Sequence, residues 1–123
     1  MENKPGLCRL KELMQIAVEE REKALLIRLT GHMGHGSVNE LTRVFDEWLG
    51  KGRQNFIVDM TRLQYISSAG LRCFFEAVTK VNNLKGKLIL CGMQPEVRQI
   101  FDVSGFTSFF SICETMQNAL RQI

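Results

Sequence analysis

The sequence lacks the closely spaced cysteines that mark zinc sites and redox centres. No two of its four cysteines are separated by the two intervening residues typical of such sites. Cys73, Cys91 and Cys113 instead lie within apolar segments, where a thiol packs as a small hydrophobic side chain. We therefore expect reduced cysteines in a protein core and a cytoplasmic location.

The chain also lacks long hydrophobic runs and a strong excess of one charge. No segment approaches the roughly 20 apolar residues that span a bilayer, and no apolar run follows the charged first residues as it would in a signal peptide. Sixteen basic and 13 acidic residues give a net charge of +3, without the clustered basic side chains of a nucleic-acid surface. These features predict a protein that contacts neither membrane nor nucleic acid directly.

The motifs of common enzyme classes are missing as well. The sequence contains no P-loop, no dinucleotide-binding glycine motif and no G-x-S-x-G nucleophile motif. His32 and His35 lie three residues apart, but no cysteine or carboxylate beside them completes a metal site. We therefore expect a protein that is not an enzyme and that binds no metal or cofactor.

What the sequence does contain is the apolar content of a single compact domain. Its 123 residues, 45% of them hydrophobic, fit the usual size of one domain and suffice for a core without disulfides or metal. Pro5, Gly6 and mixed charges mark residues 1–11 as a loose leader, so that the domain comprises residues 12–122. We expect this domain to fold as a monomer.

Hydrophobic periodicity predicts alternating strands and helices after an initial hairpin. Apolar side chains alternate with others in residues 14–18 and again in 25–30, which predicts two antiparallel strands. The later segments are expected in this order: helix 41–49, strand 55–60, a helix beginning near residue 69, strand 88–91, helix 95–104, strand 109–112 and helix 116–120. This order predicts an α/β fold whose mixed, mostly parallel sheet carries an N-terminal antiparallel hairpin and about four helices.

Two of these predictions concern local details. The three glycines of residues 31–36 predict a loop, and Ser37 with Glu40 has the pattern of a capping box at the start of the next helix. The helix near residue 69 is expected to bury one apolar face, which consists of Leu71, Phe74, Phe75, Val78 and Val81.

Residues 65–71 read Tyr-Ile-Ser-Ser-Ala-Gly-Leu and join a strand to a helix. Ser67 and Ser68 stand where a helix favours a capping hydroxyl, and capping alone explains a serine there. In the alternative interpretation, the helix start presents a hydroxyl to a protein kinase, because free amide groups and the helix dipole favour a phosphate at that position. The local sequence leaves both interpretations open.

The same segment resembles the phosphoacceptor loop of the STAS domain family, in particular that of its anti-sigma-factor antagonists. That loop reads roughly Asp-Ser-Ser/Thr-Gly-Leu and follows a strand that ends in aspartate, here Asp59. Further segments match the family in order and spacing, namely Leu29-Thr30-Gly31, Leu90-Cys91-Gly92 and Ser104-Gly105-Phe106. The resemblance covers residues 12–122.

The resemblance implies a STAS fold and a switch that works through a partner protein. In that family, the unmodified domain binds an anti-sigma factor, often itself a serine kinase, and thereby releases a sigma factor. Phosphorylation weakens this binding, and a serine phosphatase restores it. The acceptor is implied to be Ser68, two residues before Gly70, while Ser67 replaces the family's aspartate. The implied partner-binding residues are Gly31, Gly34, Asp59, Ser67, Ser68, Ala69, Gly70 and Leu71.

Two other functions stay open at this point. A STAS scaffold subunit of a transporter or signalling complex would bind its partner through the same face without phosphorylation. A small enzyme or nucleotide-binding protein would use the helix start at Ser68 to hold a phosphate, but no accompanying base, metal set or glycine run supports that function.

Overall fold

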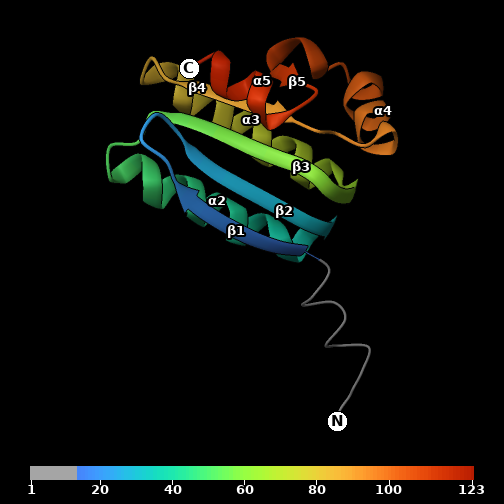
Figure 1. The fold of residues 1–123 in the computed structure, drawn as a ribbon. Helices are drawn as coiled ribbons and strands as arrows, with labels where there is room; N and C mark the ends of the chain where they lie inside the picture. Colours follow the sequence, from blue (N-terminus) through green and yellow to red (C-terminus); the bar gives the residue numbers. More distant parts are fainter. Residues whose placement is uncertain (1–13) are drawn as a thin grey trace.

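The computed structural model describes residues 14–123 and forms one five-stranded sheet between layers of helices (Figure 1). The strand order β1-β2-β3-β4-β5 follows the chain, with β1 and β2 antiparallel and all other neighbours parallel. The strands are β1 (Met14–Glu20), β2 (Leu25–Met33), β3 (Asn55–Ile66), β4 (Lys87–Cys91) and β5 (Ser111–Cys113). The predicted α/β fold with its antiparallel hairpin is confirmed, while the predicted leader, residues 1–11, lies outside the described residues.

The helices that connect the parallel strands all lie on one face of the sheet, because each new strand is added at the same edge. Right-handed crossovers between successive parallel strands then place their helices on the same face. These helices are α2 (His35–Gly50), α3 (Ser68–Asn83) and α4 (Pro95–Ser104), and a 3₁₀ turn, η1 (Thr107–Phe109), follows α4. The terminal helix α5 (Met116–Arg121) packs on the opposite face. None of the helices in residues 14–123 is long and apolar enough to cross a membrane.

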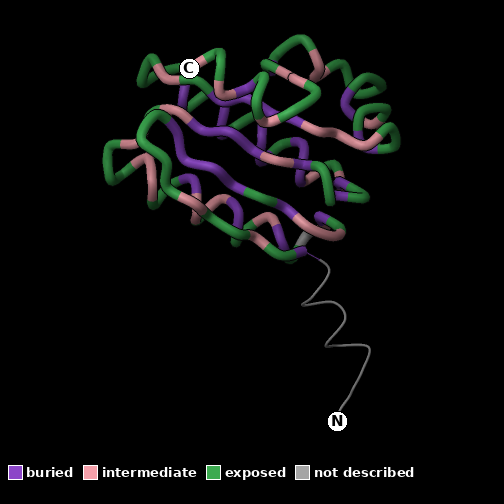
Figure 2. Tube along the Cα trace, in the orientation of Figure 1, coloured by how far each residue is buried: buried purple, intermediate pink, exposed green. Residues whose placement is uncertain are grey.

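The main core lies between the sheet and helices α2, α3 and α4. Its largest buried side chains include Phe45, Phe56, Phe74 and Phe101. The ring centroid of Phe45 lies 5.6 Å from that of Phe56 and 6.4 Å from that of Phe74, and Phe74 lies 6.3 Å from Phe101. Aromatic pairs at such distances attract each other beyond simple burial. Figure 2 shows the buried residues running along the central strands.

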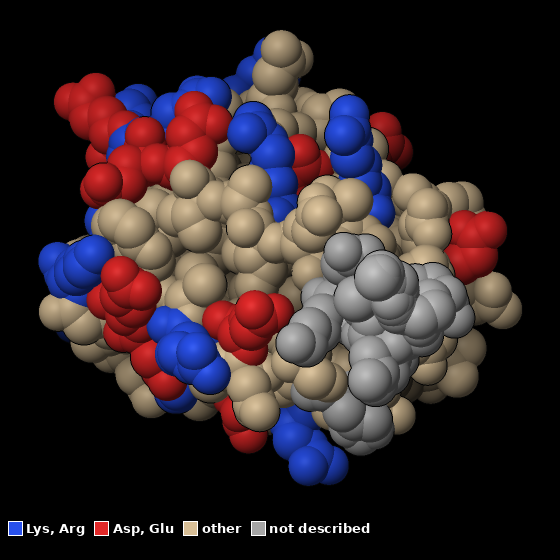
Figure 3. Space-filling view, turned by 90° about the horizontal axis from the view of Figure 1, so that it is seen from below, with Lys and Arg blue, Asp and Glu red and all other residues tan. Residues whose placement is uncertain are grey.

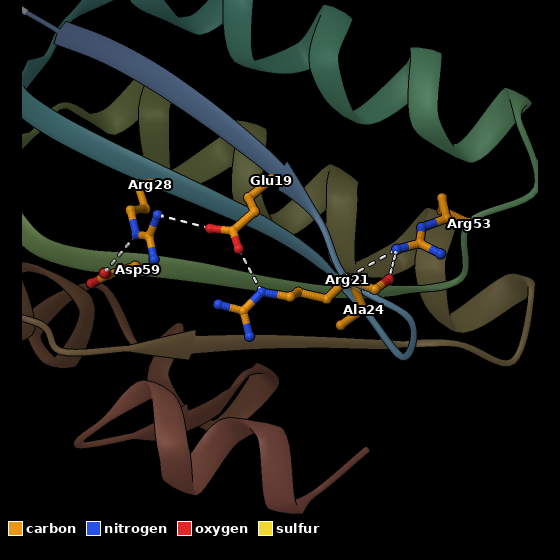
Figure 4. A network of polar contacts seen from close by, with 6 residues as sticks. All are labelled: Glu19, Arg21, Ala24, Arg28, Arg53 and Asp59. Carbon is orange, nitrogen blue, oxygen red and sulfur yellow. Dashed lines mark hydrogen bonds and ion pairs between the residues drawn. The ribbon is translucent and has the colours of Figure 1, made fainter.

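The opposite face of the sheet is covered by α5 in one part and by charged side chains in another. Ala119 of α5 is fully buried against Leu26, Ile57 and Ile89. Over β1, β2 and β3, Arg28 instead bridges two carboxylates, with Nη1 3.1 Å from Glu19 Oε1 and Nε 3.7 Å from Asp59 Oδ2 (Figure 4). Exposed ion pairs of this kind contribute little to stability, but they keep the uncovered face polar.

Two predictions about residues 31–40 are wrong. Residues 31–33 do not form a loop, because β2 continues to Met33 through a register shift next to Gly31, which has a φ of 104°. Helix α2 begins at His35 with Gly34 as its N-cap. Ser37 therefore lies inside the first turn, where it is buried, and it does not form the predicted capping box with Glu40.

The predicted bounds of two further strands are also wrong. β3 continues six residues beyond the expected end, from Thr61 to Ile66, because its second half pairs with the end of β2, with Gly31 beside Leu63 and Met33 beside Ile66. The last strand covers Ser111–Cys113 and not 109–112, since the preceding residues form the η1 turn.

Candidate functional site

The ends of β2 and β3 bring the starts of two helices together. Met33 and Ile66 are partners in the sheet, and the amide of Ser67 donates to the Met33 carbonyl over 2.9 Å. Gly34 and Ser67, the next residues along each strand, are the N-caps of α2 and α3. Helix amino ends carry free amide groups and a positive dipole, so this edge of the sheet favours a negatively charged group.

The two adjacent serines have different structural roles. Ser67 is half-buried, and its Oγ accepts a hydrogen bond of 3.1 Å from the Gly70 amide. Ser68 is the first residue of α3 and is exposed; within residues 14–123, no side-chain hydrogen bond occupies its hydroxyl. The capping prediction is therefore confirmed for Ser67, and the hydroxyl that faces solvent is that of Ser68.

Gly70 allows the first turn of α3 to lie directly against the strand ends. A Cβ atom at this position would lie 2.7 Å from Ile66 Cγ1 and 3.0 Å from Met33 Sδ. Leu71, the next residue, is also buried, and Ala69 is half-buried. The close contact fixes the position of Ser68 relative to the sheet.

A hollow of about 350 Å³ opens beside Ser68, between α3 and the end of α4. Its lining consists of Ser68, Leu71, Arg72, Phe75, Ser104 and Phe106. Ser68 and Arg72 lie four residues apart and thus on the same side of the helix. The hollow combines apolar side chains with hydroxyl and guanidinium groups.

The structure does not bring every predicted partner-binding residue to this place. Gly34, Ser67, Ser68, Ala69, Gly70 and Leu71 gather at the ends of β2 and β3, and Gly31 lies two residues before Met33. Asp59, in contrast, precedes Ile66 by seven residues of strand, which corresponds to roughly 20 Å. Its Oδ1 accepts hydrogen bonds from the amide and hydroxyl of Thr61, so its visible role is to shape β3.

Two of the three cysteines that the sequence predicted in the core are buried. Cys73 and Cys91 are buried, whereas Cys113 is half-buried. Burial raises the pKa of the Cys91 thiol to about 12, assisted by the charge of Asp59, and burial also raises the pKa of Cys73. Both thiols stay protonated at neutral pH and are poor nucleophiles. Within residues 14–123, no group of three or more His, Cys, Asp or Glu side chains is placed to hold a metal ion.

Three phenylalanines near the hollow were not predicted as surface residues. Phe75 was assigned to the buried face of α3, but 36% of it is exposed, and Phe109 was assigned to a strand but lies in η1 with 55% exposed. Together with the half-buried Phe106 they form one aromatic group. Helical spacing alone could not have found Phe75, because Leu71 and Val78, four residues before it and three after it, are both buried.

Charged residues of both signs are scattered over the face of the molecule shown in Figure 3. Lys and Arg side chains lie among Asp and Glu side chains there, with uncharged surface between them. Such a mixture lacks the single-sign field that attracts nucleic acid.

Comparison with known proteins agrees with this geometry. A family model of the STAS domain matches residues 15–119. BtrV of Bordetella bronchiseptica, provisionally named an anti-sigma factor antagonist, is 30% identical over 106 residues, which cover 86% of this chain and 91% of that protein. The anti-sigma F factor antagonist of Paenibacillus polymyxa is 24% identical over 111 residues, covering 89% and 95%.

Solved structures show the same fold at lower identity. The unphosphorylated form of the anti-sigma factor antagonist SpoIIAA matches with a TM-score of 0.78 at 21% identity, covering 88% of this chain and 95% of that one. The phosphorylated form of the same Bacillus protein matches with a TM-score of 0.71, covering 88% and 98%. On the match over residues 15–119 and the identity to BtrV, this chain belongs to the STAS domain family.

Proposed function

We propose that this protein is an anti-sigma factor antagonist whose binding to an anti-sigma factor is controlled by phosphorylation of Ser68. One observation carries the proposal: of the two adjacent serines, Ser67 uses its hydroxyl to cap α3 while Ser68 presents an exposed hydroxyl at the helix start. A kinase can reach this hydroxyl without disturbing the cap. The protein acts by binding and is not itself an enzyme.

The relatives support this role. BtrV and the Paenibacillus protein are both named as antagonists of anti-sigma factors and match nearly the full length of the domain. SpoIIAA, which shares the fold, exists in an unphosphorylated and a phosphorylated form. Because sigma factors act on RNA polymerase inside the cell, the role places this protein in the cytoplasm.

The switch follows from the chemistry of the modified serine. The kinase transfers the γ-phosphoryl group of ATP to Ser68 Oγ, which loses its proton, and ADP leaves; a serine phosphatase later hydrolyses the ester and restores the hydroxyl. The phosphate adds about −1.5 to −2 charges at an edge that already favours anions, so the fold tolerates it. A partner surface shaped for a neutral hydroxyl must desolvate that charge at a cost of several kcal/mol, enough for a hundredfold loss of affinity or more.

Phosphopeptide mass spectrometry tests the proposal, with the anti-sigma serine kinases encoded in the same genome as this chain. We expect one phosphate, on Ser68 in the unaltered protein, none in Ser68→Ala, and nearly normal labelling in Ser67→Ala. Ser68→Ala should still bind the anti-sigma factor, and Ser68→Asp should bind more weakly because it introduces a charge at the contact. Phosphate found on Ser67 alone would move the site by one residue.

A constitutive scaffold is the second candidate function, favoured by the sequence at the acceptor loop. Ser67 stands in place of the family's aspartate and Ala69 in place of its serine or threonine, so the surroundings of Ser68 differ from those that the family's kinases recognise. A chain that none of these kinases phosphorylates would support the scaffold and would remove the switch.

A further inference from the structure

Three aromatic side chains form a continuous patch on the surface next to Ser68. We call these three residues the aromatic patch: Phe75 of α3, Phe109 of η1, and Phe106, which directly precedes η1. The ring centroids of Phe75 lie 5.5 Å from Phe106 and 5.4 Å from Phe109, and those of Phe106 and Phe109 are 6.4 Å apart. Every ring therefore contacts both others, although Phe109 is 55% and Phe75 36% exposed.

The core explains only part of this cluster: Phe106 packs against the main core, whereas Phe75 and Phe109 do not belong to it. The buried stripe of α3 already fills the space above the sheet with Phe74, Ala77 and Val81, and Phe75 lies beside that stripe. Single exposed hydrophobic residues are normal on a protein surface, but clustered aromatic side chains are enriched at the centres of protein–protein interfaces.

The patch is held in place before any partner arrives. Phe110, directly after η1, is buried against Phe101 with ring centroids 5.5 Å apart. On the other side of the turn, Asp102 accepts a hydrogen bond from the Thr107 hydroxyl and pairs with Arg98 at 3.3 Å. A surface that is already ordered loses little conformational entropy when it binds.

The hollow beside Ser68 connects the patch to the proposed switch. Phe75 and Phe106 form part of its lining together with Ser68 and Leu71. Along α3, Ser68 and Phe75 are separated by two helical turns, or about 10 Å. An interface of ordinary size, about 800 Å² on each partner, that covers Ser68 through this hollow also covers the patch.

We infer that the anti-sigma factor binds across the aromatic patch, which anchors the complex while Ser68 at its margin controls it; this inference rests on the proposed function. The partner is accordingly a protein whose contact surface is apolar at its centre, where it receives Phe109 and Phe75. Anchoring and control are then separate properties. Loss of the patch weakens binding whether or not Ser68 carries a charge.

Isothermal titration calorimetry tests this inference with the purified anti-sigma serine kinase that labels Ser68, in the presence of ADP so that no phosphate is transferred. Phe109→Ser and Phe75→Ser should each weaken binding about tenfold or more. Leu84→Ser is the matched control, since Leu84 is 46% exposed at the other end of α3, and it should bind like the unaltered chain. Urea denaturation of each variant shows whether a loss of affinity reflects unfolding. Substitution of Phe109 should disturb the fold least, because Phe109 is the most exposed of the three.

The outcomes separate this inference from the proposed function. If Ser68→Asp weakens binding while Phe109→Ser and Phe75→Ser bind normally, the patch is not the anchor, although the switch stands. Equal losses in Leu84→Ser would likewise overturn the inference. If sedimentation velocity shows a dimer that Phe109→Ser dissociates, the patch belongs to self-association and not to the anti-sigma factor. An unaltered chain that binds no such kinase removes both proposals.

Discussion

At the scale of single residues, the adjacent serines show how neighbours in sequence acquire separate tasks. Ser67 has extended backbone angles, φ −85° and ψ 170°, which point its hydroxyl back at the Gly70 amide. Ser68 is already helical and exposed, and it takes no part in the cap. The sequence predicted that one of the two serines caps the helix. Which serine does so depends on where β3 ends, and the sequence could not tell because β3 was predicted to end near residue 60 and continues to Ile66.

We expect the cap to be measurable as stability. Ser67→Ala removes the acceptor for the Gly70 amide and should lower the free energy of unfolding by about 0.5–2 kcal/mol. Ser68→Ala removes an exposed hydroxyl outside the cap and should change it by less than about 0.5 kcal/mol. Urea denaturation followed by circular dichroism compares the two. Equal losses in both variants would contradict the division of roles between the serines.

At the scale of helices and strands, periodicity predicted the order of elements and missed features that arise between them. The alternation and helical spacing that predict the hairpin, the parallel strands and the four helices are local properties of the chain. The extensions of β2 and β3 are not local, since each depends on pairing with the other across a register shift. The hollow and the aromatic patch likewise depend on how α4 and η1 pack against α3, which no single segment encodes.

Two glycines, one in the α3–β4 connection and one in α2, allow the packing around them to be compared. A Cβ at Gly86, between α3 and β4, would lie 1.9 Å from the backbone oxygen of Gln54, whereas a Cβ at Gly36 in α2 meets no atom within 4 Å. Gly86→Ala should therefore lower the free energy of unfolding by about 1–3 kcal/mol or more. Gly36→Ala should raise it by up to about 1 kcal/mol because alanine favours the helix. Thermal unfolding measures both, and a Gly86→Ala protein as stable as the unaltered one would show that the α3–β4 connection can move.

At the scale of the whole molecule, the two apolar layers share one sheet and should unfold together. Cys73 belongs to the main core and Cys91 to the layer beneath α5. Their raised thiol pKa values and their burial predict very slow alkylation of the native protein by iodoacetamide at pH 8. Both should become reactive over the same range of urea concentration, since small domains usually unfold in one step.

Mass spectrometry of the alkylated peptides gives the two labelling midpoints separately. The half-buried Cys113 serves as the comparison and should be labelled before either of them. A midpoint for Cys91 well below that of Cys73 would show that α5 leaves the sheet while the main core stays folded.

The strand order also bears on how the protein is made. Because every strand pairs with the one that precedes it in the chain, a polypeptide emerging from the ribosome can add each strand to an edge that already exists. No strand has to be inserted later between two earlier ones, and sheets built from neighbouring segments form faster than those that join distant ones. The serine cap requires only β2, β3 and the start of α3. The end of the sheet that carries Ser67 and Ser68 can thus assemble while the C-terminal segments are still being synthesised.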